Sequence, residues 1–165
     1  MLADGFQLGE ADPTTDIGRA LIAELDAYLL SIYPISVCHR TTPEEILSNG
    51  VFYIAKLDEQ VVGCGALKEN KLGQLELKRM FVRPMARGKG IAKKLLAELE
   101  TLAQSKGFDA IYLETGPPQK EAIALYENAG YFRRGPFGGY DDHPLSIFME
   151  KRLDSVPSQS NGSAA

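Results

Sequence analysis

The sequence is poor in the residues that disulfide scaffolds and structural metal sites need. Its 165 residues include two cysteines, Cys38 and Cys64, and two histidines, His39 and His143. Two cysteines cannot build a disulfide framework, and they fit a reducing compartment. Because the Cys and His residues are so few and scattered, we expect no structural zinc site and no bound metal.

Long hydrophobic runs are also absent. A transmembrane helix needs ~20 apolar residues, and no stretch reaches that length. The most apolar region, residues 20–38, is interrupted by Glu24, Asp26 and Pro34. The first residues include Asp4 and Glu10, where a secretory signal has basic residues followed by an apolar run. These features predict a cytoplasmic protein that does not bind membranes.

An excess of positive charge is the third feature that the chain lacks. Its 18 basic and 22 acidic residues give a net charge of −4, so there is no general attraction for nucleic acid. The apolar content of 44% is that of a globular domain, and the length suits one domain. We expect a single domain over residues 1–153 and, from composition, a disordered tail over residues 154–165.

Apolar periodicity indicates a mixed α/β architecture. It predicts a helix over residues 16–33, capped by Thr14 or Thr15, and a short helical turn after Pro43 with Thr42 as its cap. Extended runs are predicted over residues 51–55, 61–68 and 74–82. It then predicts a helix from residue 91 to a terminal glycine at 107, a strand over 109–115, a helix around 122–129 and strands over 131–133 and 145–153. This order gives a largely antiparallel first half and a crossover helix in the second.

Positive charge is concentrated in one segment. Residues 77–97 contain seven basic residues and no acidic one, which leaves the rest of the chain with a net charge of −11. Gly88 and Gly90 lie inside this segment, at the start of the helix. Glycine exposes backbone N–H groups there, and with the helix dipole these groups suit a pyrophosphate. The alternative is a solvated helix face with a glycine turn.

Two common phosphate-binding loops are excluded by the spacing. The P-loop pattern G-x-x-x-x-G-K-[ST] does not occur, so the chain is not a P-loop NTPase. The dinucleotide pattern G-x-G-x-x-G is absent too, because Lys93 stands where its last glycine would be. The basic glycine turn is therefore of another kind.

The turn and a later segment together resemble a known family. Residues 87–92 read RGKGIA after a strand ending MFVRP, which is similar to the R-G-x-G-[IV]-[GA] acyl-CoA-binding turn of the GNAT N-acetyltransferases. Residues 122–131 read AIALYENAGY and resemble that family's A-x-x-L-Y-x-x-x-G-[FY] segment. The resemblance covers roughly residues 51–153, with details typical of a bacterial small-molecule branch. It implies the GNAT fold, a central mixed, mostly antiparallel sheet of six to seven strands flanked by helices.

The resemblance also implies acetyl-CoA as the acyl donor. The backbone of the strand before the turn would hold the pantetheine arm, and the turn would take the pyrophosphate. Gln119 stands where the family usually has asparagine, so its contact with the pantetheine is carried over with a longer side chain. The cofactor-binding residues implied in this way are Met80, Phe81, Val82, Arg87, Gly88, Lys89, Gly90, Ile91, Ala92, Lys93, Gln119 and Tyr126.

Transfer of an acetyl group to an amine needs a proton acceptor for the ammonium, an oxyanion donor and a proton for the thiolate. By resemblance, Tyr126 is the general acid near the CoA sulfur, and a backbone N–H of residues 80–82 is the oxyanion donor. The base is Glu76 on the central strand or Glu114 at the end of the next strand, unless the amine arrives already deprotonated. Strand alternation predicts that Glu76 shares a face with Lys78 and Met80, opposite Arg79.

The sequence therefore predicts an N-acetyltransferase that moves the acetyl group of acetyl-CoA to a primary amine of a small metabolite such as an amino acid, by direct attack in a ternary complex. The alternatives are a protein N-terminal or lysine acetyltransferase and a non-catalytic acyl-CoA-binding module. Relatives are commonly homodimers, which makes a homodimer an expectation here. The glycine-rich loop at residues 136–140 is either a lid on the acceptor side or a rigid connection.

Overall fold

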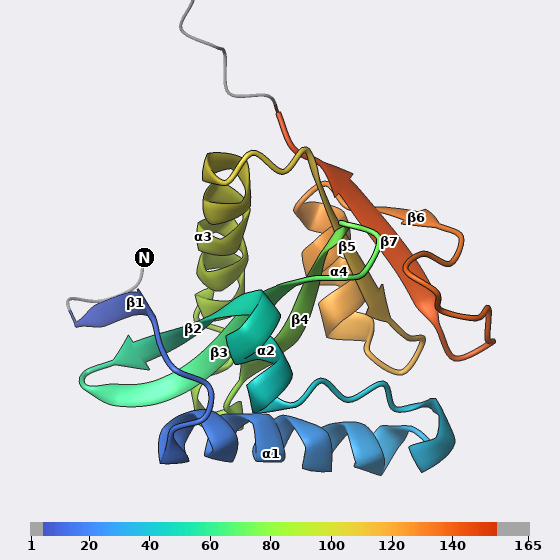
Figure 1. Ribbon diagram of the computed structural model, residues 1–165. Helices are drawn as coiled ribbons and strands as arrows, with labels where there is room; N and C mark the ends of the chain where they lie inside the picture. The colour runs from blue at the N-terminus through green and yellow to red at the C-terminus, as the bar shows by residue number, and fades with distance from the viewer. Residues whose placement is uncertain (1–4, 155–165) are drawn as a thin grey trace, which may run out of the picture.

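The structure, a computed structural model, describes residues 5–154. These residues form a seven-stranded sheet in the order β1-β2-β3-β4-β5-β7-β6 (Figure 1). Within it β4 and β5 run parallel, and every other neighbouring pair is antiparallel. The predicted mixed, mostly antiparallel sheet flanked by helices is confirmed, with seven strands. Apart from Asp154, the predicted tail lies outside the described residues.

The sheet begins with a strand that the sequence analysis did not predict. β1 (Phe6–Glu10) pairs antiparallel with β2 (Gly50–Leu57), so the predicted order, which opens on a helix, is wrong at its start. Phe6 and Leu8 pack against the core at a spacing of two, and the residues between and beside them do not. Two apolar positions are too short a pattern to separate a strand from a loop, because pairing with β2 is what specifies it.

Two capped helices follow β1. α1 (Asp16–Ile32) begins at Thr15, whose side chain accepts a hydrogen bond from the Gly18 N–H. A short 3-10 turn (Ile35–Val37) leads toward α2 (Pro43–Asn49), which opens with a capping box between Thr42 and Glu45. Both predicted helix starts are confirmed, because the hydroxyl groups satisfy N–H groups that the helix leaves unpaired.

The strands β2, β3 (Gln60–Glu69) and β4 (Leu75–Val82) form the predicted antiparallel meander. The β2–β3 turn places Asp58 and Glu59 at positive φ angles of 49° and 67°. Two consecutive left-handed residues make the tight turn whose twist matches a hairpin. The first half of the chain therefore needs no long loop to build its sheet.

The second half supplies the crossover. Its elements are α3 (Ile91–Ser105), β5 (Ala110–Thr115), α4 (Lys120–Asn128), β6 (Phe132–Arg134) and β7 (Ile147–Arg152). α3 connects the parallel strands β4 and β5, as a parallel pair requires. Each element lies within a few residues of its predicted range.

The helices cover both faces of the sheet (Figure 1). On one face, Leu21 and Leu25 of α1 and Ile46 of α2 pack on Phe52 and Cys64. On the other face, α3 and α4 share a core cluster with the sheet; its helical members include Leu96, Leu99, Ala103 and Tyr126. Each large aliphatic side chain buried in this way contributes about 1.5–3 kcal/mol. The two layers fix the sheet from both sides.

A β-bulge interrupts β4. The register with β3 pairs Lys78 with Ala66 and Phe81 with Cys64, so two residues of β4 stand opposite one residue of β3. The first of the two, Arg79, has a positive φ of 59°. An extra residue of this kind bends the strand and shifts the side-chain alternation beyond it by one.

The bulge corrects the predicted faces of β4. Arg79 lies on the α1 side, where its guanidinium is buried and donates to Asp26 Oδ1 at 2.8 Å. Met80 instead packs in the α3 layer with Leu77. The prediction that Glu76 lies on the face of Met80 and opposite Arg79 is wrong. Glu76 and Arg79 lie on one face and Met80 on the other, because the inserted residue shifts the alternation by one.

β4 and β5 separate after a single registered pair, Glu76 with Tyr112. Within residues 5–154, no strand continues the ladder on the β5 side of β4 beyond this pair. Backbone groups of the last residues of β4 therefore lack a sheet partner on that edge. The edge is open to the clefts that form the candidate site.

Candidate functional site

The turn between β4 and α3 combines two glycines with an uncapped helix start. Gly88 and Gly90 have φ angles of 78° and 79°, in the left-handed region that favours glycine. Gly90 is the N-cap of α3 and has no side chain to bond the first helical N–H groups. These groups and the positive end of the helix dipole are available to an anion.

The basic run divides into two groups. Three of its members form ion pairs within the fold: Lys78 with Glu76, Arg79 with Asp26 and Arg83 with Glu24. The other four, Arg87, Lys89, Lys93 and Lys94, form no ion pair with any residue from 5 to 154. The uncompensated positive charge is therefore confined to the glycine turn and the first turn of α3.

A cleft of about 550 Å³, here called the turn cleft, opens beside this turn. Of the residues expected to bind the cofactor, Met80, Phe81, Val82, Arg87, Gly88, Gly90, Ile91, Ala92, Lys93, Gln119 and Tyr126 line it. Lys89 does not. The structure also adds residues that sequence reasoning missed, Tyr28 on α1 and Leu125 on α4. A volume of this size is in the range of roughly 300–1,000 Å³ typical of ligand sites.

Arg87 is held at the mouth of the turn cleft by its neighbours. Its Nε donates to the Val82 carbonyl at 2.9 Å. Its guanidinium lies 5.6 Å from the ring centroid of Tyr28 and 5.8 Å from that of Phe81. Aromatic faces attract a cation, so the charge is oriented before any ligand arrives.

Tyr126 lies where the turn cleft meets a second cleft. This central cleft has a volume of about 120 Å³, and Leu25, Met80, Gln119 and Tyr126 line both clefts. Burial raises the pKa of the Tyr126 hydroxyl well above its usual value. The hydroxyl therefore keeps its proton at neutral pH and is a donor toward either cleft.

Gln119 is oriented by two hydroxyl groups. Its Oε1 accepts from the Tyr33 hydroxyl at 2.9 Å and from Thr115 Oγ1 at 3.3 Å. Because the oxygen is occupied, the amide nitrogen is left as a donor in the clefts. Burial raises the pKa of Tyr33 to about 12, so this hydroxyl stays protonated and the orientation of Gln119 persists through neutral pH.

A third, outer cleft of about 720 Å³ continues from the central one. His39, Glu76, Lys78 and Ser146 line both. The outer cleft takes its walls from segments far apart in the chain, between residues 36 and 146. The central cleft therefore shares wall residues with the turn cleft on one side and with the outer cleft on the other.

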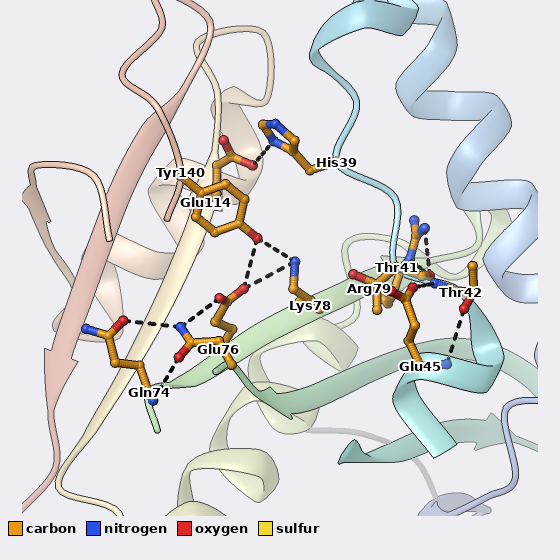
Figure 2. A network of polar contacts seen from close by, with 11 residues as sticks. His39, Thr41, Thr42, Glu45, Gln74, Glu76, Lys78, Arg79, Glu114 and Tyr140 are labelled. Atoms are coloured by element: carbon orange, nitrogen blue, oxygen red, sulfur yellow. Dashed lines mark hydrogen bonds and ion pairs between the residues drawn. The ribbon is translucent and has the colours of Figure 1, made fainter. Parts of the chain in front are cut away.

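Glu76 is engaged on both carboxylate oxygens (Figure 2). Asn70 Nδ2 donates to Oε1 at 3.1 Å, and the Tyr140 hydroxyl donates to Oε2 at 3.0 Å. Lys78 Nζ lies 3.2 Å from Oε2 and also donates to the Tyr140 oxygen at 2.8 Å. Burial and the adjacent Glu76 raise the pKa of Tyr140. The carboxylate therefore organises a closed network of three partners.

Glu114 is engaged on one oxygen only. Its Oε1 lies 2.9 Å from His39 Nδ1 (Figure 2), while its Oε2 is buried without a hydrogen-bond partner among residues 5–154. Both residues line the central cleft. A carboxylate oxygen accepts hydrogen bonds and cannot donate them, so a ligand donor is what this position lacks. His39 carries no motif, and sequence reasoning gave it no role.

The glycine-rich loop at residues 136–140 is anchored rather than loose. Phe137 is buried, with its ring centroid 5.4 Å from Tyr140 and 5.7 Å from Phe148. Gly138 has a φ of 60°, and a Cβ there would lie 2.7 Å from the Asn70 side chain. These contacts favour the rigid connection over the lid.

Residues 17–131 match the Acetyltransferase (GNAT) family. The chain belongs to the GNAT family. The match spans the glycine turn and the segment around Tyr126, so the resemblance drawn from these two motifs is confirmed.

Individual GNAT relatives agree with this assignment. An IAA acetyltransferase from Azospirillum brasilense is 42% identical over 88% of this chain and 97% of its own. A Klebsiella pneumoniae structure described as an acyl-CoA N-acyltransferase is 35% identical, with a TM-score of 0.77 over 90% of this chain and 98% of that one. A Bacillus anthracis structure described as a streptothricin acetyltransferase in complex with acetyl-CoA is 26% identical, with a TM-score of 0.56 over 64% of each chain.

The protein is accordingly a GNAT acetyltransferase, an acetyl-CoA-dependent N-acyltransferase. Among residues 5–154, no helix is long and apolar enough to span a membrane. The same residues contain no group of three or more His, Cys, Asp or Glu side chains placed to hold a metal ion.

Proposed function

We propose that this GNAT protein acts in the cytoplasm and transfers the acetyl group of acetyl-CoA to the primary amine of a small metabolite such as an amino acid, by direct attack in a ternary complex. The observation that carries this proposal is the continuity of the clefts. Leu25, Met80, Gln119 and Tyr126 line both the turn cleft and the central cleft, and His39 lines both the central and the outer cleft. Donor and acceptor can therefore enter from opposite ends and meet beside Tyr126.

The turn cleft is the proposed donor site. The free N–H groups at the start of α3 and the oriented Arg87 supply donors for the pyrophosphate. The unpaired edge of β4 offers backbone partners to the amides of the pantetheine arm. The amide nitrogen of Gln119 adds a side-chain donor. Lys89 lies outside the cleft lining and is the least supported member of the expected set.

Glu114 is better placed than Glu76 to receive the ammonium of the acceptor. Glu76 already has Lys78, Tyr140 and Asn70 as partners. Glu114 keeps one buried oxygen free beside the central cleft. An ammonium placed there gains a charge-assisted hydrogen bond, whereas at Glu76 it would have to displace the lysine.

The outer cleft supports an acceptor that also carries a negative charge. Arg40, Lys68 and Lys71 line it, and none of them forms an ion pair with residues 5–154. Asp141 and Asp142 line the same cleft, so its unpaired groups within residues 5–154 are three basic and two acidic side chains, and the remaining positive charge attracts a carboxylate. An amine at the inner end and a carboxylate at the outer end together describe an amino acid.

Tyr126 is the proposed general acid. The hydroxyl is protonated at neutral pH because burial raises its pKa, and it lies between the donor and acceptor clefts. Donating that proton to the departing thiolate makes the sulfur a better leaving group. A backbone N–H at the open edge of β4 would stabilise the negative charge that develops on the carbonyl oxygen.

A substrate screen tests the proposal. The purified protein is incubated with acetyl-CoA and single acceptors, and CoA release is followed with a thiol reagent against an acceptor-free blank. Free amino acids are compared with their methyl esters, which keep the amine and lose the carboxylate, and with short peptides. We expect free amino acids to be acetylated at least about tenfold faster than the esters, as loss of one charged contact predicts.

Two other outcomes would replace the proposal. Turnover restricted to peptides would identify a protein acetyltransferase. Binding of acetyl-CoA without CoA release for any acceptor would identify a non-catalytic acyl-CoA-binding module. IAA is included as a second candidate acceptor because the Azospirillum relative bears that name at 42% identity.

A further inference from the structure

His39 and Glu114 form a contact between two distant parts of the chain. His39 follows the 3-10 turn that leads from α1 to α2, and Glu114 lies near the end of β5, 75 residues later. Nδ1 of His39 is 2.9 Å from Oε1 of Glu114. The His39 ring also stands edge-on to Tyr140, with a centroid distance of 5.1 Å. Two contacts therefore fix the position of the imidazole on the cleft wall.

The two members of the pair differ in exposure. The Glu114 side chain is 18% exposed and that of His39 46%. Glu114 lines the central cleft and has a buried Oε2 without a partner among residues 5–154, whereas His39 lines both the central and the outer cleft. The pair runs from the buried reaction centre outward to solvent.

The groups around the pair do not supply a competing proton acceptor. Tyr33 and Tyr140 are protonated, because burial raises the pKa of each. Glu76 is paired with Lys78. Arg79 is paired with Asp26, and the central cleft adds the Cys38 thiol and the hydroxyls of Thr41, Thr115 and Ser146. The other charged or titratable groups, Arg40, Lys68, Lys71, Asp141, Asp142 and His143, line the outer cleft and not the central one. Glu114 and His39 are therefore left as the acceptors at the central cleft.

We propose that His39 and Glu114 act together as the proton acceptor for the acceptor ammonium, with His39 passing the proton on to solvent. This inference rests on the proposed function. The free Oε2 of Glu114 binds the ammonium, and one N–H bond of the ammonium breaks as the proton moves to the pair. The neutral nitrogen then attacks the acetyl carbonyl and the C–S bond breaks. The second proton lost by the nitrogen balances the one that the thiolate receives, through Tyr126.

The first test is the pH dependence of turnover in His39→Gln. Without the imidazole, the proton has no relay to solvent, so we expect kcat to fall by about 100-fold between pH 6.5 and 7.5, the lower end of the usual scale of general acid–base catalysis. At pH 9.5, where amines lose their proton to water, kcat should approach that of the unmodified protein. His39→Ala should regain activity with added imidazole, because the vacated position opens to solvent.

His143→Gln is the matched control. His143 is the other histidine of the chain, and its Nδ1 accepts from the Leu145 N–H at 3.0 Å instead of contacting a carboxylate. Its replacement should leave the shape of the pH profile unchanged. A loss in His39→Gln that is equal at all pH values, without imidazole rescue of His39→Ala, would show a merely structural role and overturn the inference.

A second measurement does not depend on turnover. The C2–H resonances of the two histidine rings are compared by NMR at one pH in the unmodified protein and in Glu114→Gln. Since Glu114 Oε1 lies 2.9 Å from His39 Nδ1, the substitution should move the chemical shift of His39 and leave that of His143 in place. An unmoved His39 resonance contradicts the pairing. Absence of turnover in the unmodified protein overturns the proposed function, whereas turnover with an unchanged profile in His39→Gln overturns this inference alone.

Discussion

The turn cleft takes its charged and backbone donors mainly from one run of chain, residues 87–93, whereas the outer cleft draws its polar walls from segments spread between residues 36 and 146. The turn cleft uses backbone N–H groups at the start of α3, which are present whatever side chains the turn carries. The outer cleft uses particular side chains, such as Glu76 with Lys78 and Tyr140, that must all be present together. In the proposed function, the acetyl-CoA donor and the acceptor are therefore recognised by different physical means on one scaffold.

The largest effect is expected when the charge of the glycine turn, in the proposed acetyl-CoA site, is reversed. In the double variant Arg87→Glu with Gly88→Asp, two carboxylates face the pyrophosphate position, and the introduced aspartate must adopt the φ of 78° that glycine has there. We expect the Kd for acetyl-CoA, measured by calorimetry, to rise by about 1,000-fold, equivalent to about 4 kcal/mol. The thermal stabilisation that acetyl-CoA gives should disappear with it.

Its matched control lies at the other end of the same helix. Lys106→Glu with Gly107→Asp changes charge by the same amount and also places aspartate at a positive φ, here 85°. This variant should keep its acetyl-CoA affinity even if it loses some stability. Equal loss of affinity in both variants would show that the turn has no specific role.

The place where the turn cleft meets the central cleft is tested by Tyr126→Phe. Removing the hydroxyl removes the proposed proton donor and keeps the ring, so kcat should fall by about 100-fold while the Kd for acetyl-CoA changes little. Tyr131→Phe is the control, since its ring packs 5.7 Å from that of Tyr126 in the same core. An equal fall in kcat for both variants would show that the loss comes from altered packing of the core and not from a missing proton donor.

The most direct test of the proposed acceptor site is a substitution of Glu76. Glu76→Gln leaves the partly buried ammonium of Lys78 without its carboxylate, which should lower the free energy of unfolding by about 1–3 kcal/mol in urea titrations. Glu114→Gln should cost less stability and more kcat, because it removes the proposed proton acceptor while the partner it loses, His39, is largely exposed. A large loss of kcat in Glu76→Gln at an unchanged free energy of unfolding would identify Glu76 as the general base.

Residues that act through local sequence were predictable, and residues that act through tertiary pairing were not. The helix caps at Thr15 and Thr42 and the turn at Gly88 and Gly90 depend on neighbours within a few positions, so their patterns stand in the sequence. His39 has no local partner, because its carboxylate is 75 residues away.

The misassigned elements have the same origin. β1 has two apolar positions and takes its register from β2. The bulge at Arg79 is stabilised by Asp26 of α1 and by the Thr41 carbonyl, neither of which is near it in sequence. For Glu76 and Glu114, the sequence left two candidate bases, and only the contacts of their individual oxygens separate them.

The bulge also constrains how the length of β4 can change during evolution. The residues before it and those after it belong to opposite phases of the strand, since Leu77 and Met80 reach the same layer across an odd spacing. Deleting Arg79 would bring Met80 into regular register opposite Gly65, which keeps Met80 and Phe81 in their layers but removes the guanidinium that bonds Asp26 and the Thr41 carbonyl. Deleting any other residue of β4, with the bulge retained, would move all side chains on one side of the deletion to the opposite layer, so Arg79 is the position where β4 can change its length without rebuilding the core.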